Sequence, residues 1–143
     1  MSVTIPNWVT FLKSQSDLTT TDLRTSIFPS DQVPQSRNPP YLLLTLIGDE
    51  PVRHHGGHAG LDLQVVQFDL VARNKGQARE IWDVLRRLDT YVGEIVSGKE
   101  THSTQLDLPQ DTTEPPAEGE QYAPARFTAQ MRSIQPTTVT AWT

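Results

Sequence analysis

Two stretches of the chain repeat apolar residues at helical spacing. The first, residues 4–15, has Pro6 where a first helical turn accepts it, because the missing N–H of proline costs nothing there. The second, residues 74–93, begins at Asn74, which is a fair N-cap, and can be closed by Gly93. The apolar stripes are Ile5, Trp8, Val9 and Leu12 in the first stretch and Ala78, Ile81, Trp82, Leu85 and Leu88 in the second. The pattern therefore predicts one short and one main helix, each with one face in the core.

Shorter apolar runs predict strands. Residues 24–28 favour a short strand, and residues 41–48 form an apolar run of strand length with both faces largely covered. Within residues 61–73 apolar and polar residues alternate, which predicts a buried face of Val66, Phe68, Leu70 and Ala72. Upstream of this face the apolar residues fall in the opposite phase, so we expect a bulge or twist near Gln64. These upstream residues are Leu61, Leu63 and Val65.

The remaining strands and the order of the elements define the expected fold. Residues 99–109 and 122–134 complete the predicted strands, and residues 41–48 pair with residues 61–73 as an antiparallel hairpin. The order of helix, strands, helix and strands contains no repeated unit. It predicts a single α+β domain over residues 1–134, with a mostly antiparallel β-sheet, one main and one short helix packed on one face, and long loops.

Two polar segments lie outside the expected sheet. Residues 107–121 form an acidic, proline-rich loop that is long for a hairpin connection, so we expect it to be mobile or ordered only by a partner. Its carboxyl groups, such as those of Asp107 and Asp111, are expected to be solvated, so their pKa values have little reason to move. Residues 135–143 form a polar C-terminal tail.

Composition narrows the range of functions. The chain has 143 residues, and its 12 basic and 17 acidic residues give a net charge of -5 without a basic run, which argues against nucleic-acid recognition. It contains no cysteine, which excludes disulfides and thiolate zinc sites. The N-terminus lacks the pattern of a signal peptide, and no segment approaches the roughly 20 apolar residues of a membrane span. We expect a soluble protein, made in the cytoplasm, that does not insert into a membrane.

The sequence RHHGGHAG, residues 53–60, raises the question of a metal site. On a helix, the spacing of His54 and His58 would let two imidazoles share an ion. Gly56 and Gly57 disfavour a helix there, and no glutamate lies between the histidines. The nearest acidic residues in sequence, none of which is fixed as a further ligand, are Asp49, Glu50 and Asp62. We therefore expect no native metal site.

The same stretch is better explained as the tip of the predicted hairpin. Its glycines give the backbone freedom to turn, and exposed histidines supply hydrogen-bonding groups for contact with another subunit or protein. The predicted assembly loop consists of Arg53, His54, His55, Gly56, Gly57 and His58.

No catalytic constellation accompanies these surface features. The chain has no G-x-S-x-G motif for a nucleophilic serine and no glycine-rich motif for binding phosphate. Neither enzymatic activity nor a cofactor is expected. A glycine- and histidine-rich hairpin tip, an acidic loop and free sheet edges are together typical of a protein that works by assembling.

The order of motifs resembles a family, the tail completion or tail terminator proteins of long-tailed bacteriophages. LRTSIFPSDQVPQSRNPPYLLL, residues 23–44, is similar to that family's arginine, short strand ending in Phe/Tyr-Pro, Pro-Gln, and Pro-Tyr entering an apolar strand. Residues 54–93 resemble its next block, in which a His/Gly turn leads into a strand with Gln-x-Asp, here Gln67 and Asp69, and then a helix. YAPARFTAQMRSI, residues 122–134, corresponds to its last strand.

The resemblance covers roughly residues 20–134 and implies a structural role in the virion. Such proteins form a ring, usually a homo-hexamer, on the head-proximal end of the tail tube. The ring stops polymerisation of the major tail tube protein, docks the head–tail connector or stopper protein, and lets genomic DNA pass through its lumen without sequence-specific binding. The alternatives are a small histidine-based metal-binding or hydrolytic protein and a different ring protein of the head–tail neck.

Overall fold

A single twisted sheet organises the molecule. The computed structural model describes residues 3–34, 38–54, 57–116, 118–119 and 123–136, with the backbone alone at residues 53, 54 and 57–59. The strands follow the order β1 (Ile27–Pro29), β2 (Tyr41–His54), β3 (Gly57–Ala72), β8 (Ala125–Pro136) and β6 (Ser103–Leu106), and β7 (Gln110–Asp111) also pairs with β8. Only the short β1–β2 pairing is parallel among these strands. The predicted α+β fold with a mostly antiparallel sheet is therefore confirmed.

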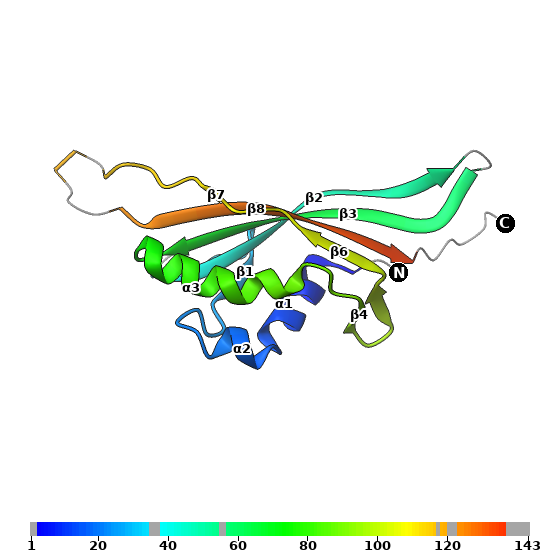
Figure 1. The fold of residues 1–143 in the computed structure, drawn as a ribbon, viewed down its shortest axis with the longest axis horizontal. Coiled ribbons are helices and arrows are strands. Elements are labelled where there is room, and N and C mark those ends of the chain that lie inside the picture. The colour runs from blue at the N-terminus through cyan, green and yellow to red at the C-terminus, as the bar shows by residue number, and fades with distance from the viewer. Residues whose placement is uncertain (1–2, 35–37, 55–56, 117, 120–122, 137–143) are drawn as a thin grey trace.

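The helices lie on one face of this sheet (Figure 1). They are α1 (Ile5–Lys13), α2 (Ser16–Thr19), α3 (Lys75–Leu85) and the 3₁₀ turn η1 (Arg86–Leu88). The side chain of Thr4 caps α1 in a capping box with Asn7, and the side chain of Asn74 caps α3 by accepting a hydrogen bond from the backbone of Gln77. The expected short and main helices are both present, but the prediction that the main helix extends to Gly93 is wrong, because α3 and its 3₁₀ turn end at Leu88. The helix α2 was not predicted.

The core fills the space between the helices and the sheet. Alternate residues of β3 and β8 point into it, as the period of a strand requires. Trp8 of α1 and Ile81 of α3 pack against the same apolar layer. Its largest fully buried side chains are Trp8, Phe68, Leu12, Leu18, Leu23, Ile27, Leu42, Leu44, Leu70, Ile81, Leu85 and Met131.

A buried polar cluster joins the N-terminal segment to the sheet. Gln64 is 1% exposed, and its Oε1 accepts hydrogen bonds from Trp8 Nε1 at 2.8 Å and from Gln135 Nε2 at 2.7 Å. Its Nε2 donates to the backbone carbonyl of Val3, and the backbone N–H of Val3 donates to Gln135 Oε1. Each polar group that Gln64 brings into the core thus has a partner, as burial requires.

The predicted change of phase near Gln64 does not occur on β3. β3 and β8 keep an unbroken register from Leu61 to Ala72, so Gln64 stays on the helix-covered side of the sheet. The irregularity lies on β2, where the register with β3 shifts between Leu46 and Gly48 and leaves Ile47 as the extra residue of a bulge. The sequence pattern was misread because a satisfied glutamine occupies a core position.

The β2–β3 hairpin is longer than the sequence predicted. The expected strands 41–48 and 61–73 continue through the intervening polar residues as far as His54 and Gly57. The base of this extension is supported by β8, which pairs with β3 up to Leu61 and Pro136. The hairpin end projects beyond the helical layer (Figure 1). Strand β8 also continues two residues into the segment expected as a tail.

The region between α3 and β8 differs most from the sequence prediction. The single strand expected at residues 99–109 is divided into β5 (Lys99–Thr101) and β6. β5 pairs with β4 (Gly93–Val96) as a small separate hairpin that was not predicted. The short strand expected at residues 24–28 begins later, at Ile27, because Arg24 has a left-handed backbone conformation with φ of 53°.

Candidate assembly surfaces

The predicted assembly loop forms the end of the β2–β3 hairpin. Arg53 pairs with His58 and His54 with Gly57 across the two strands. His55 and Gly56 lie outside the described residues, as do the side chains of all three histidines. No group of three histidines or acidic residues that could hold a metal occurs elsewhere in the described part of the chain. The expectation of no native metal site is therefore not tested at the hairpin end, where the three histidines occur in the sequence.

The outer edge of β2 is open beyond its first residues. β1 pairs only with Leu42, Leu43 and Leu44, so within the described chain no strand covers the outer edge from Thr45 onward. Open edges promote pairing or docking, although the bulge at Ile47 and the proline at position 51 make this one a poor template for simple strand addition.

Two large apolar side chains are exposed at this edge. Leu46 is 47% exposed and Ile47 is 51% exposed, and the acidic residues Asp49 and Glu50 follow them. Leu46 is paired with the fully buried Val66 but lies on β2 beyond the residues that β1 covers. We call Leu46, Ile47, Asp49 and Glu50 the arm base. It offers a small apolar knob bordered by negative charge.

The opposite edge of the sheet is closed to strand addition at β6. The backbone N–H of Thr90 donates to the carbonyl of Thr104 at 2.8 Å, and the backbone N–H of Leu106 donates to Asp89 Oδ1 at 3.0 Å. These bonds use main-chain groups that an added strand would need. A partner at this edge must therefore dock by side-chain contacts.

Beside β6 and β7, a groove of about 1070 Å³ runs between α3 and residues 106–111. Its apolar lining comes from Trp82, Leu106, Leu108, Pro109 and Phe127. Leu108 is 84% exposed, the most exposed large apolar residue in the described part of the chain. Its charged lining comprises the basic residues Lys75, Arg79 and Arg86 and the acidic residues Asp83, Asp89, Asp107 and Asp111. We call this feature the α3 groove.

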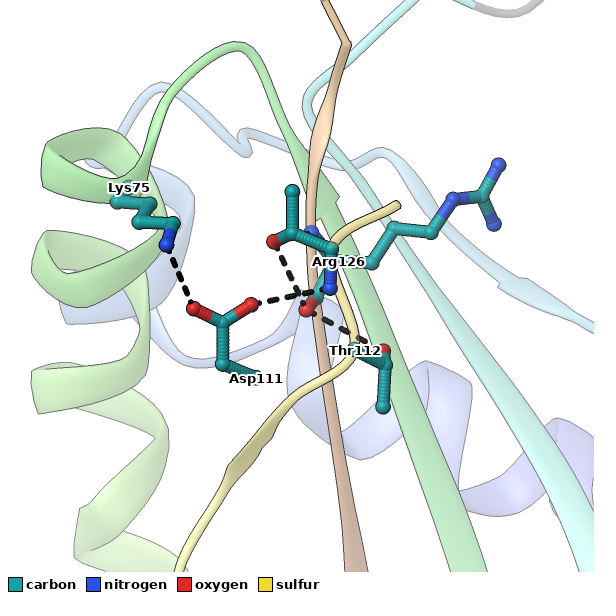
Figure 2. A network of polar contacts seen from close by, with 5 residues as sticks. Lys75, Asp111, Thr112 and Arg126 are labelled. Carbon is teal, nitrogen blue, oxygen red and sulfur yellow. Dashed lines mark hydrogen bonds and ion pairs between the residues drawn. The ribbon is translucent and has the colours of Figure 1, made fainter. Parts of the chain in front are cut away.

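The strand wall of the α3 groove is anchored by a polar network (Figure 2). Lys75 Nζ lies 2.9 Å from Asp111 Oδ2, and Thr112 donates from its backbone N–H to the carbonyl of Arg126 at 2.8 Å. The hydroxyl of Thr113 accepts a hydrogen bond from the backbone N–H of Arg126. The guanidinium of Arg126 points away from this network (Figure 2). The expectation that the loop 107–121 is mobile or ordered only by a partner is therefore wrong for residues 107–113, which are held by contacts within the chain.

The expectation that the pKa values in this loop do not move is also wrong for Asp111. Hydrogen bonding from the Thr113 hydroxyl, then from Lys75 and from the Thr113 backbone, lowers the pKa of Asp111 from 3.8 to about 2. Asp107 is held separately, by both carboxylate oxygens, through the guanidinium of Arg132 at 2.9 and 3.0 Å. The acidic residues of the strand wall are thus already paired, whereas Arg79 makes no ion pair within the described chain.

The sheet face opposite the helices is polar at its centre. Gln67 and Thr128 both donate hydrogen bonds to the carboxylate of Asp69, at 3.1 and 2.8 Å. Gln67 lies between Thr45 and Gln130 in adjacent strands. These side chains alternate with the buried ones of β3 and β8, and they are half-buried. The Gln-x-Asp pattern noted in the sequence therefore lies on the face that no described helix covers.

Sequence reasoning found the hairpin end but missed the arm base and the α3 groove. The signal for the arm base is Leu46-Ile47 directly before Gly48, Asp49 and Glu50, but the same pair also fits the buried interior of a strand. The α3 groove joins residues about 30 positions apart, which no local pattern reveals. Comparison with protein-family models and with curated proteins finds no match to this chain. None of the helices in the described ranges is long and apolar enough to cross a bilayer.

Proposed function

We propose that this chain is a structural protein of a phage virion, a ring-forming tail terminator on the head-proximal end of the tail tube. The observation that carries the proposal is the presence of two unlike contact surfaces at opposite edges of one sheet, the arm base and the α3 groove. Contacts between unlike surfaces are heterologous, and they close into a ring when the rotation between subunits allows it.

The order of motifs along the chain supports the same function. The arginine before β1, the Pro-Tyr entry into β2, and the strand with Gln67 and Asp69 that leads into α3 all resemble the tail terminator pattern. In this proposal a homo-hexamer stops growth of the tube with one ring face and docks the head–tail connector or stopper protein with the other. The net charge of -5 lets DNA pass through the lumen without being held by its phosphates.

The proposal is tested with the major tail tube protein of the same virus, polymerised in vitro. Adding this chain should give shorter tubes with a ring at one end in electron micrographs, and the effect should saturate at one ring per tube end. A variant with Glu50→Arg in the arm base should have a weaker effect. Tubes that reach the same lengths with and without excess wild-type protein would contradict the proposal.

A further inference from the structure

We infer that the arm base of one copy docks into the α3 groove of a second copy of this chain, and that this contact is the repeated subunit interface. The ring geometry rests on the proposed function, whereas the contact itself depends only on two surfaces of this chain. A second copy occupies the groove, with its Leu46 and Ile47 against the apolar lining and its Glu50 against Arg79.

The apolar parts of the two surfaces match in kind and in exposure. Ile47 is the extra residue of a bulge and is 51% exposed, and Leu108, which lines the α3 groove, is 84% exposed. Docking one against the other removes both from water and extends the contact toward Trp82 and Phe127, which line the groove. Within the described chain, three of the four exposed large apolar residues belong to these two surfaces.

One complementary pair of charges can form between the two surfaces. Glu50 is an exposed acid of the arm base. The α3 groove is lined by three basic and four acidic residues, and Lys75 and Arg86 already pair with Asp111 and Asp83. On the strand wall, Asp111 is engaged by Lys75 and Asp107 by Arg132, so these acids do not oppose an incoming carboxylate freely. Arg79, which has no ion-pair partner in the described chain, is left to pair with Glu50 of the second copy.

Because the two surfaces lie at opposite edges of the sheet, the same contact can be repeated from one copy to the next. The arm base lies on β2, at one edge of the sheet, and the α3 groove lies beside β6 and β7 at the other. A copy that uses its arm base to dock still presents its α3 groove to the next copy. Repetition of this contact gives a ring or a chain rather than a closed dimer.

Disulfide cross-linking tests the contact cleanly because the chain contains no cysteine. Ile47→Cys and Leu108→Cys are introduced together, and the purified protein is oxidised at high concentration. We expect a ladder of cross-linked species that extends beyond the dimer, since each copy carries both halves of the contact. Each single variant can form dimers at most. Circular dichroism verifies that every variant is folded.

A matched control pair is Ile47→Cys with Val92→Cys. Val92 is 64% exposed and apolar, but it lies at the start of the β4–β5 hairpin, outside the α3 groove. This pair should give no ladder. Equal ladders from the two pairs, or no ladder from Ile47→Cys with Leu108→Cys, would overturn the inference.

A charge exchange in the cross-linking variant tests the Glu50–Arg79 pair. Arg79→Glu should slow cross-linking about fivefold, the order expected for an exposed ion pair. Adding Glu50→Arg to the same chain should restore the rate, whereas Lys13→Glu, on the exposed surface of α1, should leave it unchanged. Failure of the exchange to restore the rate contradicts this pairing.

The outcomes separate the contact from the proposed function. A ladder from a protein that leaves tube length unchanged supports the contact and contradicts the tail terminator role. Shortened tubes without a ladder contradict the contact and support the role.

Discussion

The two ends of the β2–β3 hairpin belong to the same strands but have opposite environments. At one end, Leu42, Leu44 and Leu70 are fully buried beneath the helices, and β1 covers the edge of β2. Farther along β2, beyond β1, the side chains of the arm base are exposed and no described strand covers this edge, although Val66 and Gln64 beside them on β3 are buried. Stability therefore comes from the covered half, and the projecting half is free to be used for contact.

This difference predicts that substitutions in the covered half cost far more than substitutions in the projecting half. Phe68→Ala removes a fully buried ring from the core and should lower the free energy of unfolding by about 4 kcal/mol. Leu46→Ala, in the arm base, should cost less than about 1 kcal/mol because the side chain is half exposed. Urea unfolding of both variants measures the contrast, and equal losses would show that the arm base is packed.

A second comparison uses the two faces of β3. Gln64→Leu leaves the indole N–H of Trp8 and the carbonyl of Val3 without their partner, and should cost about 3 kcal/mol despite the more apolar side chain. Gln67→Leu makes the same change on the uncovered face, where only one hydrogen bond to Asp69 is lost, and should cost about 0.5 kcal/mol. Thermal unfolding gives both values. A stabilised Gln64→Leu variant would mean that the buried polar cluster does not hold the N-terminal segment.

A third experiment tests whether residues 110–113, in the segment after β6, are held against α3 and β8. Because the pKa of Asp111 is lowered to about 2, its contribution to stability is present above the ordinary value of 3.8 and is lost as the pH falls through about 2. Lys75→Met should raise the pKa of Asp111 only part of the way, since Thr113 still stabilises the carboxylate. Arg79→Met removes a charge from the same groove wall and should leave that pKa nearly unchanged. An NMR titration of the Asp111 carboxyl measures this pKa. An ordinary pKa in the wild type would mean that Lys75 and Thr113 do not hold residues 110–113 in place.

Local pattern was sufficient for the covered half of the molecule. Helical stripes and strand alternation identified α1, α3, β2, β3 and β8, because burial against a single layer imposes a regular period. The pattern failed where a polar residue is buried with its own partners, as at Gln64, and where exposed residues continue a strand, as at Asp49 and Glu50. In both cases the residue types are those of a loop, so the local sequence does not show that the residue lies in the core or in a strand.

The candidate site was less predictable than the fold for a related reason. The hairpin end could be placed from its glycines and histidines, but the α3 groove depends on how residues 106–111 lie against α3. That arrangement follows from contacts such as Lys75 with Asp111 and Asp89 with Leu106, which join positions far apart in the chain. Sequence alone could not specify them.

The smallest effect on stability is expected at the hairpin end itself. Replacing His54, His55 and His58 together by alanine should change the free energy of unfolding by less than about 0.5 kcal/mol, because this end lies beyond the strands and helices that form the core. The same variant should retain the ladder of the cross-linking experiment if the arm base and the α3 groove make the subunit contact. Elemental analysis of the untagged wild type tests the metal alternative directly. Stoichiometric zinc that disappears in the triple variant, together with a large loss of stability, would show that the hairpin end is a metal-stabilised structure and would reverse the contrast between the two halves.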